Sequence, residues 1–473
     1  MRGPRASKIT VQASVHRTFL GPRRTMPSSR NTVLATAAVL AAALCPPLLA
    51  APAASAAPAK YADDFNGDGY RDYAYSGSVT DAGSDGSGTV GVIYGTATGP
   101  NGRKQNLTQN SAGIPGANEW DDGFGNAMAA ADFNRDGYAD LAVGVYGEDV
   151  GTVAEQGAVM IVWGSASGLS GATSVPNKAP GKSHQMGLDL AAGDFNGDGR
   201  PDLALINDHT AHVYAGSFTK SGFSGKVTKL TNDRMFAEHL AAGRVTKDTA
   251  ADLVVVGGVD GTRHTVSGAW FIRGGSTLTR GATYELGTGE DTSWEVDTQI
   301  ADFDKDGYGD IALGHPNAQG KGGVLVWRGG STGPGGVTRL NQNTTGVTGA
   351  MESGDRFGAR ISVGDVNGDG YPDLAVAAPG EDIGGHADAG ALHILRGGPS
   401  GLTGAKSQFF DRNTSGVPGG LEANASFGDY LRLRDSDRDG HADLFTDYLR
   451  LRGHSGGITT SGVQDTVSSD FLQ

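Results

Sequence analysis

A nine-residue motif rich in oxygen-bearing side chains occurs six times in this chain, beginning at Asp64, Asp132, Asp194, Asp302, Asp365 and Asp435. Its pattern is Asp-x-Asn/Asp-x-Asp-Gly-x-x-Asp, which places carboxylates or amides at positions one, three, five and nine and a glycine at the sharpest bend. Such a loop can chelate a hard divalent cation. Calcium fits best, because it accepts about six to eight oxygens in flexible geometry.

The predicted metal ligands are the side chains at positions one, three, five and nine and the backbone carbonyl at position seven. They are Asp64, Asn66, Asp68, Tyr70 and Asp72; Asp132, Asn134, Asp136, Tyr138 and Asp140; Asp194, Asn196, Asp198, Arg200 and Asp202; Asp302, Asp304, Asp306, Tyr308 and Asp310; Asp365, Asn367, Asp369, Tyr371 and Asp373; and Asp435, Asp437, Asp439, His441 and Asp443. The motif differs from an EF-hand, which needs a glutamate at position twelve and helices on both sides. Position twelve is apolar here, as at Val143.

The alternative is a metal-free hairpin in which Asn and Asp side chains bond to their own backbone. This alternative explains the residue types at a turn, but it does not explain why four chelating positions stay in register six times. Without a cation, carboxylates only a few ångströms apart would repel one another strongly. The sequence therefore predicts up to six calcium ions with a structural role.

Short apolar runs flank each motif and indicate the elements that position it. Ala129-Ala130-Ala131 precedes the second motif and Leu141-Ala142-Val143-Gly144 follows it. Such runs, bounded by Gly, Asn and Asp, are typical of strands. Each unit is therefore predicted to be a strand, a metal loop, a strand, a turn, a third strand and a less regular outer strand. The 77 glycines among 473 residues suit short strands and tight turns.

A seventh unit keeps the flanking strands but not the chelating positions. Arg244 replaces the first ligand and Thr246 the third, while Asp248 and Asp252 remain. We predict no metal in this unit, around 244–252, and expect the Arg244 guanidinium to hold the two carboxylates instead. The seven units are spaced about sixty residues apart, which suits one four-stranded blade each. The predicted fold is all-β, a seven-bladed β-propeller over residues 57–473. Six or eight blades would also fit, and we expect the two termini to complete a shared blade.

Residues 1–56 are predicted to be a secretory signal region, with cleavage after Ala56. Basic residues precede an apolar run from Val33 to Ala50, and small residues follow it. Met26 stands just before this pattern and is a candidate for the true start. The chain's one cysteine, Cys45, lies inside the segment, so the mature protein would have no disulfide, thiolate metal site or cysteine nucleophile.

Charge and hydropathy limit the partners. The segment 1–56 carries seven basic residues and no acid, so its removal takes the formal net charge from −14 to −21. Such an acidic protein repels nucleic acid and anionic membranes. No later segment is long and apolar enough to span a bilayer. We expect a secreted, extracellular monomer.

The combination of Phe-Gly, the calcium loop and a Gly-Ala-Pro-like turn resembles the FG-GAP or VCBS-like repeat of the integrin alpha-chain N-terminal propeller. Phe124-Gly125, Phe357-Gly358 and Phe427-Gly428 supply the first element, and Ala378-Pro379-Gly380 approximates the last. The resemblance implies a seven-bladed propeller with calcium on the loops of one face. Integrin legs and a membrane span have no counterpart here, and the chain looks more like a secreted actinobacterial member. The adhesion role therefore transfers only as an analogy of fold.

The predicted function is a calcium-binding, non-catalytic binding or adhesion module for extracellular proteins or glycans. Its acidic stretches Glu119–Asp122 and Glu381–Asp382 are candidate contact regions. Trp163, Trp270 and Trp327 are predicted to pack between blades rather than to stack on sugars. Gly453–Gly457 matches a nucleophile elbow, but no histidine follows it, so we assign no catalytic or cofactor-binding residue. The alternative is a secreted polysaccharide lyase or hydrolase built on the same calcium-stabilised propeller.

Overall fold

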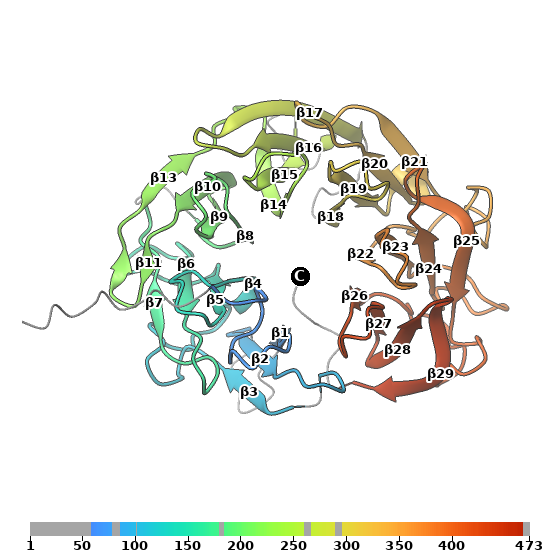
Figure 1. Ribbon diagram of the computed structural model, residues 1–473, viewed down its shortest axis with the longest axis horizontal. Coiled ribbons are helices and arrows are strands. Elements are labelled where there is room, and N and C mark those ends of the chain that lie inside the picture. The colour runs from blue at the N-terminus through green and yellow to red at the C-terminus, as the bar shows by residue number, and fades with distance from the viewer. Residues whose placement is uncertain are drawn as a thin grey trace, which may run out of the picture. The chain divides into compact units, whose positions relative to one another are not determined.

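The computed structural model describes residues 58–77, 86–100, 102–178, 184–259, 266–288 and 296–466. The predicted signal region and its cleavage site lie outside these residues. The described residues form seven antiparallel sheets placed side by side around a centre, with β4, β8, β14, β18, β22 and β26 innermost (Figure 1). The fold is the predicted seven-bladed β-propeller. None of the helices in the described part of the chain could span a membrane.

The first three blades use the N-terminal strands. Blade 1 contains β1 (Tyr73–Gly77), β2 (Thr89–Ile93) and β3 (Lys104–Leu107). Blade 2 contains β4 (Phe124–Ala131), β5 (Asp140–Val145), β6 (Ala158–Val162) and β7 (Ala172–Ser174). Blade 3 contains β8 (Leu190–Gly193), β9 (Asp202–Asn207), β10 (Thr210–Ala215) and β13 (Lys226–Lys229), with a small hairpin of β11 (Phe218–Thr219) and β12 (Gly222–Phe223) beside them.

The other four blades follow the same order. Blade 4 contains β14 (Phe236–Gly243), β15 (Asp252–Gly258), β16 (Val266–Arg273) and β17 (Thr279–Thr288). Blade 5 contains β18 (Thr298–Ala301), β19 (Asp310–His315), β20 (Gly323–Trp327) and β21 (Val337–Leu340), with a one-turn 3-10 helix η2 (Ala318–Gly320) between β19 and β20. Blade 6 contains β22 (Ile361–Gly364), β23 (Asp373–Ala378), β24 (Ala391–Arg396) and β25 (Thr403–Phe410). Blade 7 contains β26 (Arg432–Arg434), β27 (Asp443–Thr446), β28 (Leu449–His454) and β29 (Gly457–Asp465).

The second strand of each blade is apolar on both faces because it lies between two neighbouring sheets. All six residues of β5, Asp-Leu-Ala-Val-Gly-Val, are buried, and so are all six of β23. Three of the innermost strands, β4, β8 and β14, are rich in Ala and Gly, which suits a place where several sheets converge. Position two of the loops is a core residue: Phe65, Phe195, Phe303 and Val366 are fully buried.

The three tryptophans in or beside the third strands also pack in the core. Trp163, Trp270 and Trp327 are each at most 4% exposed and lie in clusters between neighbouring blades. This confirms the packing prediction for them. The elbow-like segment is part of an ordinary hairpin, because His454 at the end of β28 pairs with Gly457 at the start of β29.

Closure of the ring differs from the prediction. Among the described residues, all four strands of blade 7 come from the C-terminal part of the chain and the three strands of blade 1 come from the N-terminal part, so these strands do not form the expected shared blade. In the same part of the chain, six interblade cores hold ten or more buried residues each, whereas the core between blades 7 and 1 holds Tyr73, Ile93 and Phe445.

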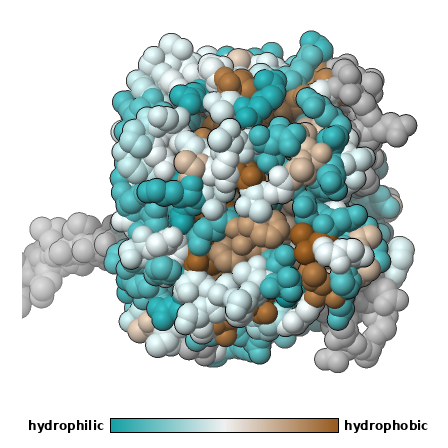
Figure 2. Space-filling model, turned by 90° about the vertical axis from the view of Figure 1, so that its right-hand side faces the viewer, coloured by the Kyte–Doolittle hydropathy of each residue, from teal (hydrophilic) through white to brown (hydrophobic). Residues whose placement is uncertain are grey.

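Polar contacts supplement this small core. Arg434 of β26 reaches Asp63 at 2.6 Å, and the Arg450 guanidinium donates to the Thr98 carbonyl at 3.1 Å. Ring closure therefore rests on side chains rather than on strand pairing among the described residues. Away from this seam, the outer rim near β21 and β25 is mainly hydrophilic, with scattered apolar patches (Figure 2).

Candidate metal loops and the central pocket

Five of the predicted metal loops join the innermost strand of a blade to its second strand, and loop 64–72 directly precedes β1 in blade 1. The position-one carboxylate accepts a hydrogen bond from the position-six N–H in every loop, at 2.6–3.1 Å. The position-five carboxylate accepts one from the position-seven N–H, at 2.8–3.2 Å. Position six is glycine because its φ is positive, for example +94° at Gly137. These bonds turn the side-chain oxygens into the loop.

The position-nine aspartate fastens the loop to the blade. In the second loop, Asp140 is fully buried and accepts hydrogen bonds from the N–H groups of Phe133 and Gly164, at 3.0 and 2.9 Å. Burial raises the pKa of Asp140 to about 8, and the charges of Asp136 and Asp132 contribute to the rise. A cation in the loop would favour the ionised form of this carboxylate and offset its burial.

Several carboxylate oxygens in the loops are buried without a hydrogen-bond donor in the described part of the chain and are therefore available to bind a cation. Asp64 Oδ1, Asp435 Oδ1 and Asp437 Oδ1 are buried and accept no hydrogen bond from the described residues. One oxygen from each of Asp302, Asp304 and Asp306 lies within 4.8 Å of the others, and the same holds for Asp435, Asp437 and Asp439. A buried oxygen without a partner is costly. The donor set of these loops therefore fits a hard divalent cation, and the full list of ligands stays a prediction.

The last loop differs from the others because two arginines of β28 enter it. Arg450, 3% exposed, contacts Asp437 and Asp443, each at 2.8 Å. Arg452 contacts Asp437 at 2.6 Å and Asp439 at 3.5 Å. These guanidinium groups already supply positive charge to three of the predicted ligands.

In the degenerate loop a guanidinium does hold a carboxylate, but it comes from a different residue. Arg273, at the end of β16, contacts Asp248 at 3.0 Å, whereas the sequence had pointed to Arg244. Asp252 instead accepts hydrogen bonds from the N–H groups of Val245, Thr246 and Gly274. Arg273 and Arg452 share one signal that sequence reasoning missed. Each immediately precedes a glycine near the end of its blade's third strand: Gly274 follows the last residue of β16, and Gly453 is the last but one residue of β28.

The loops also link neighbouring blades, which the sequence analysis did not foresee. The position-eight N–H donates to the position-one carbonyl of the preceding loop in four pairs: Ala139 to Asp64, Ala251 to Asp194, Gly309 to Arg244 and Ala442 to Asp365, at 2.7–2.9 Å. In the loops 194–202 and 365–373, position eight is a proline, Pro201 or Pro372. Proline has no N–H, so these two loops cannot form the same bond.

A cation–π contact adds to this linkage at three junctions. The basic residue at position four of one loop covers the tyrosine at position seven of the next, as Lys247 over Tyr308, Lys305 over Tyr371 and Arg438 over Tyr70. The last pair joins blade 7 to blade 1, with Arg438 3.8 Å from the Tyr70 ring centre. Among the described residues these contacts link neighbouring loops at every junction except that between blades 2 and 3, and a cation in one loop would stiffen the loop joined to it.

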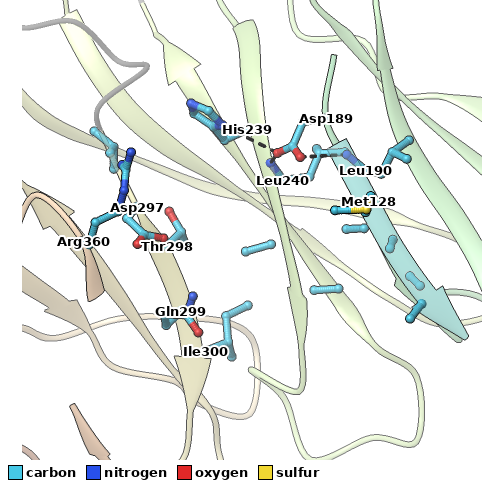
Figure 3. A pocket seen from close by; sticks show the side chains of 17 residues that line it. Met128, Asp189, Leu190, His239, Leu240, Asp297, Thr298, Gln299, Ile300 and Arg360 are labelled. Atoms are coloured by element: carbon cyan, nitrogen blue, oxygen red, sulfur yellow. Dashed lines mark hydrogen bonds and ion pairs between the residues drawn. The ribbon is translucent and has the colours of Figure 1, made fainter. Parts of the chain in front are cut away.

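A pocket of about 340 Å³ lies among the innermost strands β4, β8, β14 and β18 (Figure 3). Asp189 accepts a hydrogen bond from the Leu240 N–H of the next blade at 2.7 Å, and His239 Nδ1 lies 3.7 Å from the same carboxylate. Asp297 accepts one from the Ile361 N–H of its neighbouring blade at 2.9 Å. These two aspartates therefore connect inner strands as well as line the pocket.

Comparison with known proteins also finds a repeated unit in this chain. The family model of the FG-GAP repeat matches residues 124–162, 186–222 and 357–395, which fall in blades 2, 3 and 6. The chain thus carries FG-GAP repeats arranged as a seven-bladed β-propeller, and it is similar in sequence to integrin alpha chains.

Two relatives illustrate the similarity. Phosphatidylinositol-glycan-specific phospholipase D of Bos taurus is 33% identical over 150 residues, which are 30% of this chain and 17% of that protein. Human integrin alpha-6 is 30% identical over 126 residues, which are 24% of this chain and 10% of the integrin. The chain therefore matches less than a fifth of the length of either relative.

One solved structure also aligns. It is an Agrocybe aegerita lectin described as recognising non-reducing terminal N-acetylglucosamine. It gives a TM-score of 0.44 at 15% identity, with 72% of this chain and 79% of that chain covered. A TM-score of this size does not by itself define the fold.

Proposed function

We propose that the protein is a secreted, calcium-binding β-propeller that acts as a non-catalytic binding module for extracellular proteins or glycans. Calcium, held by the loops described above, would fasten the blades into a rigid ring. The similarity to integrin alpha chains supports a role in binding proteins.

The observation that carries the binding role is the placement of exposed apolar side chains. In the described part of the chain the exposed large hydrophobic residues are Trp120, Val150, Tyr430 and Tyr448. Trp120 and Tyr430 precede the innermost strands of blades 2 and 7, and Val150 and Tyr448 lie in turns between second and third strands. All four are therefore at the strand ends opposite the metal loops. Exposed aromatic side chains are enriched in interfaces, so this face is the proposed binding surface.

The test is retention of the secreted protein on glycan and extracellular-protein arrays in calcium, compared with a Trp120→Ala, Tyr448→Ala double variant. We expect retention by at least one class of ligand and its loss in the double variant, with the melting temperature unchanged. An Arg234→Ala variant is a suitable control, because Arg234 and its partner Glu285 are both exposed. Retention that survives the double substitution would show that the surface lies elsewhere.

A polysaccharide lyase or hydrolase is the second candidate function, favoured by the Asp189–His239 pair, Asp297 and Arg360 around one pocket. The engagement of both aspartates by backbone N–H groups supports a structural role instead. Incubation with a polysaccharide panel separates the two. Turnover that disappears in His239→Ala would establish the enzyme, and binding without turnover would support the module.

A further inference from the structure

Blade 2 has a second cluster of acidic side chains, at the strand ends opposite its metal loop. Gln109, only 1% exposed, donates from Nε2 to the Glu148 carboxylate at 2.5 Å. Asp122, 2% exposed, accepts a hydrogen bond from the Glu119 N–H at 2.7 Å, and its carbonyl accepts one from Gly147 at 3.0 Å. These bonds bring the segment before β4 against the turn after β5.

The same arrangement recurs in blade 6. The counterparts are Gln342, Glu352, Asp355 and Glu381, each 233 residues further along the chain. Gln342 donates to the Glu381 carboxylate, and Asp355 accepts from the Glu352 N–H at 2.6 Å. The Asp355 carbonyl accepts from Gly380 at 3.1 Å, as Asp122 does from Gly147. An accidental grouping of surface acids would not repeat in this detail.

An unused oxygen in each cluster points to a ligand. Gln109 Oε1 and Gln342 Oε1 are buried and have no hydrogen-bond partner among the described residues. Each amide lies at hydrogen-bond distance from its glutamate, so either orientation of the amide leaves one of its polar atoms unsatisfied. Leaving a buried polar atom without a partner costs stability. A cation that bound the amide oxygen together with the neighbouring carboxylates would remove that cost.

The charges around the glutamates point the same way. Asp355, Glu352 and Asp382 lie close enough to Glu381 for their negative charges to act on it. Asp122, Glu119 and Asp149 surround Glu148 in the same way. In blade 6 the positive charge of Lys321 acts on Asp355. Gly88 and Gly322 pack alike, against the backbones of Phe124 and Phe357. Ser87 therefore stands where blade 6 has Lys321, which makes the blade 2 cluster the more negative of the two.

We propose that each cluster binds a divalent cation, calcium, independently of the nine-residue loops. Gln109, Asp122 and Glu148 supply the oxygens in blade 2, and Gln342, Asp355 and Glu381 supply them in blade 6. All are hard oxygen donors, the class that calcium prefers. The clusters lie at the same strand ends as the proposed binding surface, but this inference does not depend on the proposed binding function, because its tests measure cation binding alone.

Trp120 offers a site-specific probe, because it adjoins Glu119 and Asp121 and its counterpart in blade 6 is Ser353. Terbium luminescence excited through tryptophan is measured on the secreted protein and on Trp120→Phe, and the difference isolates emission that depends on Trp120. We expect a clear difference that calcium competes away, that Glu148→Gln abolishes and that Asp136→Asn, in the metal loop, leaves intact. Absence of a Trp120-dependent signal, or its persistence in Glu148→Gln, would overturn the proposal.

Gln109→Glu gives a second test by thermal unfolding. Without a cation, the added carboxylate would lie against Glu148 in a buried place and lower the melting temperature. With calcium it would be an additional charged ligand. We therefore expect calcium to raise the melting temperature more in this variant than in the unchanged protein, and less in Gln109→Leu. Equal calcium-induced shifts in all three proteins, or failure of Gln109→Glu to fold in calcium, would contradict a metal role. Calcium binding by the metal loop 132–140 is measured separately, through its loss in the Asp136→Asn variant.

Discussion

The loops 302–310 and 435–443 share one chelating pattern but have different electrostatic surroundings. In the first, Asp302, Asp304 and Asp306 converge without an ion pair to a basic side chain among the described residues. In the second, Arg450 and Arg452 reach into the loop from β28.

The degenerate loop 244–252 completes the comparison. There the chelating residues are largely gone, and Arg273 contacts Asp248 from the end of β16. The dependence of a loop on calcium is therefore set by residues on the third strand of the blade as well as by the motif. We infer that 302–310 depends most on the metal, that 435–443 binds it most weakly of the six, and that 244–252 does without it.

Removing calcium from the whole protein should have the largest effect. Ions that bind only the folded state stabilise it by about 2.7 kcal/mol per site at one hundred times Kd. Several loops act together, so we expect a chelator to lower the melting temperature by well over ten degrees, measured by circular dichroism. Restoring calcium should reverse the change. Coincident unfolding curves with and without chelator would contradict the structural role of the metal.

Arg450→Leu should have the next largest effect, because it leaves the Asp437 and Asp443 carboxylates without their buried partner. Breaking such a pair costs about 3–5 kcal/mol. We expect that loss in chelator, measured by urea unfolding, and a smaller loss in calcium, because the vacated loop can then bind the ion. Arg452→Leu is the matched control, since its side chain is 45% exposed and its loss should cost less. A loss of equal size in both solutions would show that calcium cannot replace the guanidinium.

Asp136→Ala should cost more stability than Asp248→Ala when calcium is present. The first substitution removes a predicted metal ligand and with it up to about 2.7 kcal/mol of binding free energy. The second removes a half-exposed ion pair, which is worth about 1 kcal/mol or less. Unfolding in calcium and in chelator should show the difference between the variants shrinking when the metal is absent. Equal losses in calcium would contradict our interpretation of the degenerate loop.

Ala139→Pro should have the smallest effect. It removes the hydrogen bond from position eight to the Asp64 carbonyl, which contributes about 1 kcal/mol. The chain itself carries proline at this position in two loops, so the backbone conformation allows it. We expect a loss of about that size, the same in calcium and in chelator. If the loss of stability depended strongly on calcium, this hydrogen bond between blades would be coupled to cation binding in the loop, which would contradict the prediction.

Features of the fold that depend on short, repeated sequence motifs could be predicted from the sequence. The repeated nine-residue motif and its flanking apolar runs predicted the strands, the number of blades and the inward-facing oxygens. The packing of the three tryptophans between blades was predicted as well. These features depend on residues that are close together in the chain.

The rest depends on residues that meet only in the folded blade. Arg450 and Asp437 are thirteen residues apart and face each other only because β28 lies beside β27. The contact of Arg434 with Asp63 joins opposite ends of the chain, so nothing local predicted how the ring closes. The paired acidic clusters in blades 2 and 6 were noticed only as acidic stretches, because the buried glutamines that complete them stand well before those stretches.

The most direct test of the account is a crystal structure of the secreted protein grown in calcium, with anomalous scattering used to locate the ions. We predict strong peaks inside the loops at 64–72, 132–140, 194–202, 302–310 and 365–373, a weak peak or none at 435–443, and none at 244–252. Empty density in all of the loops, or an equally strong peak beside Arg273, would contradict the central claim.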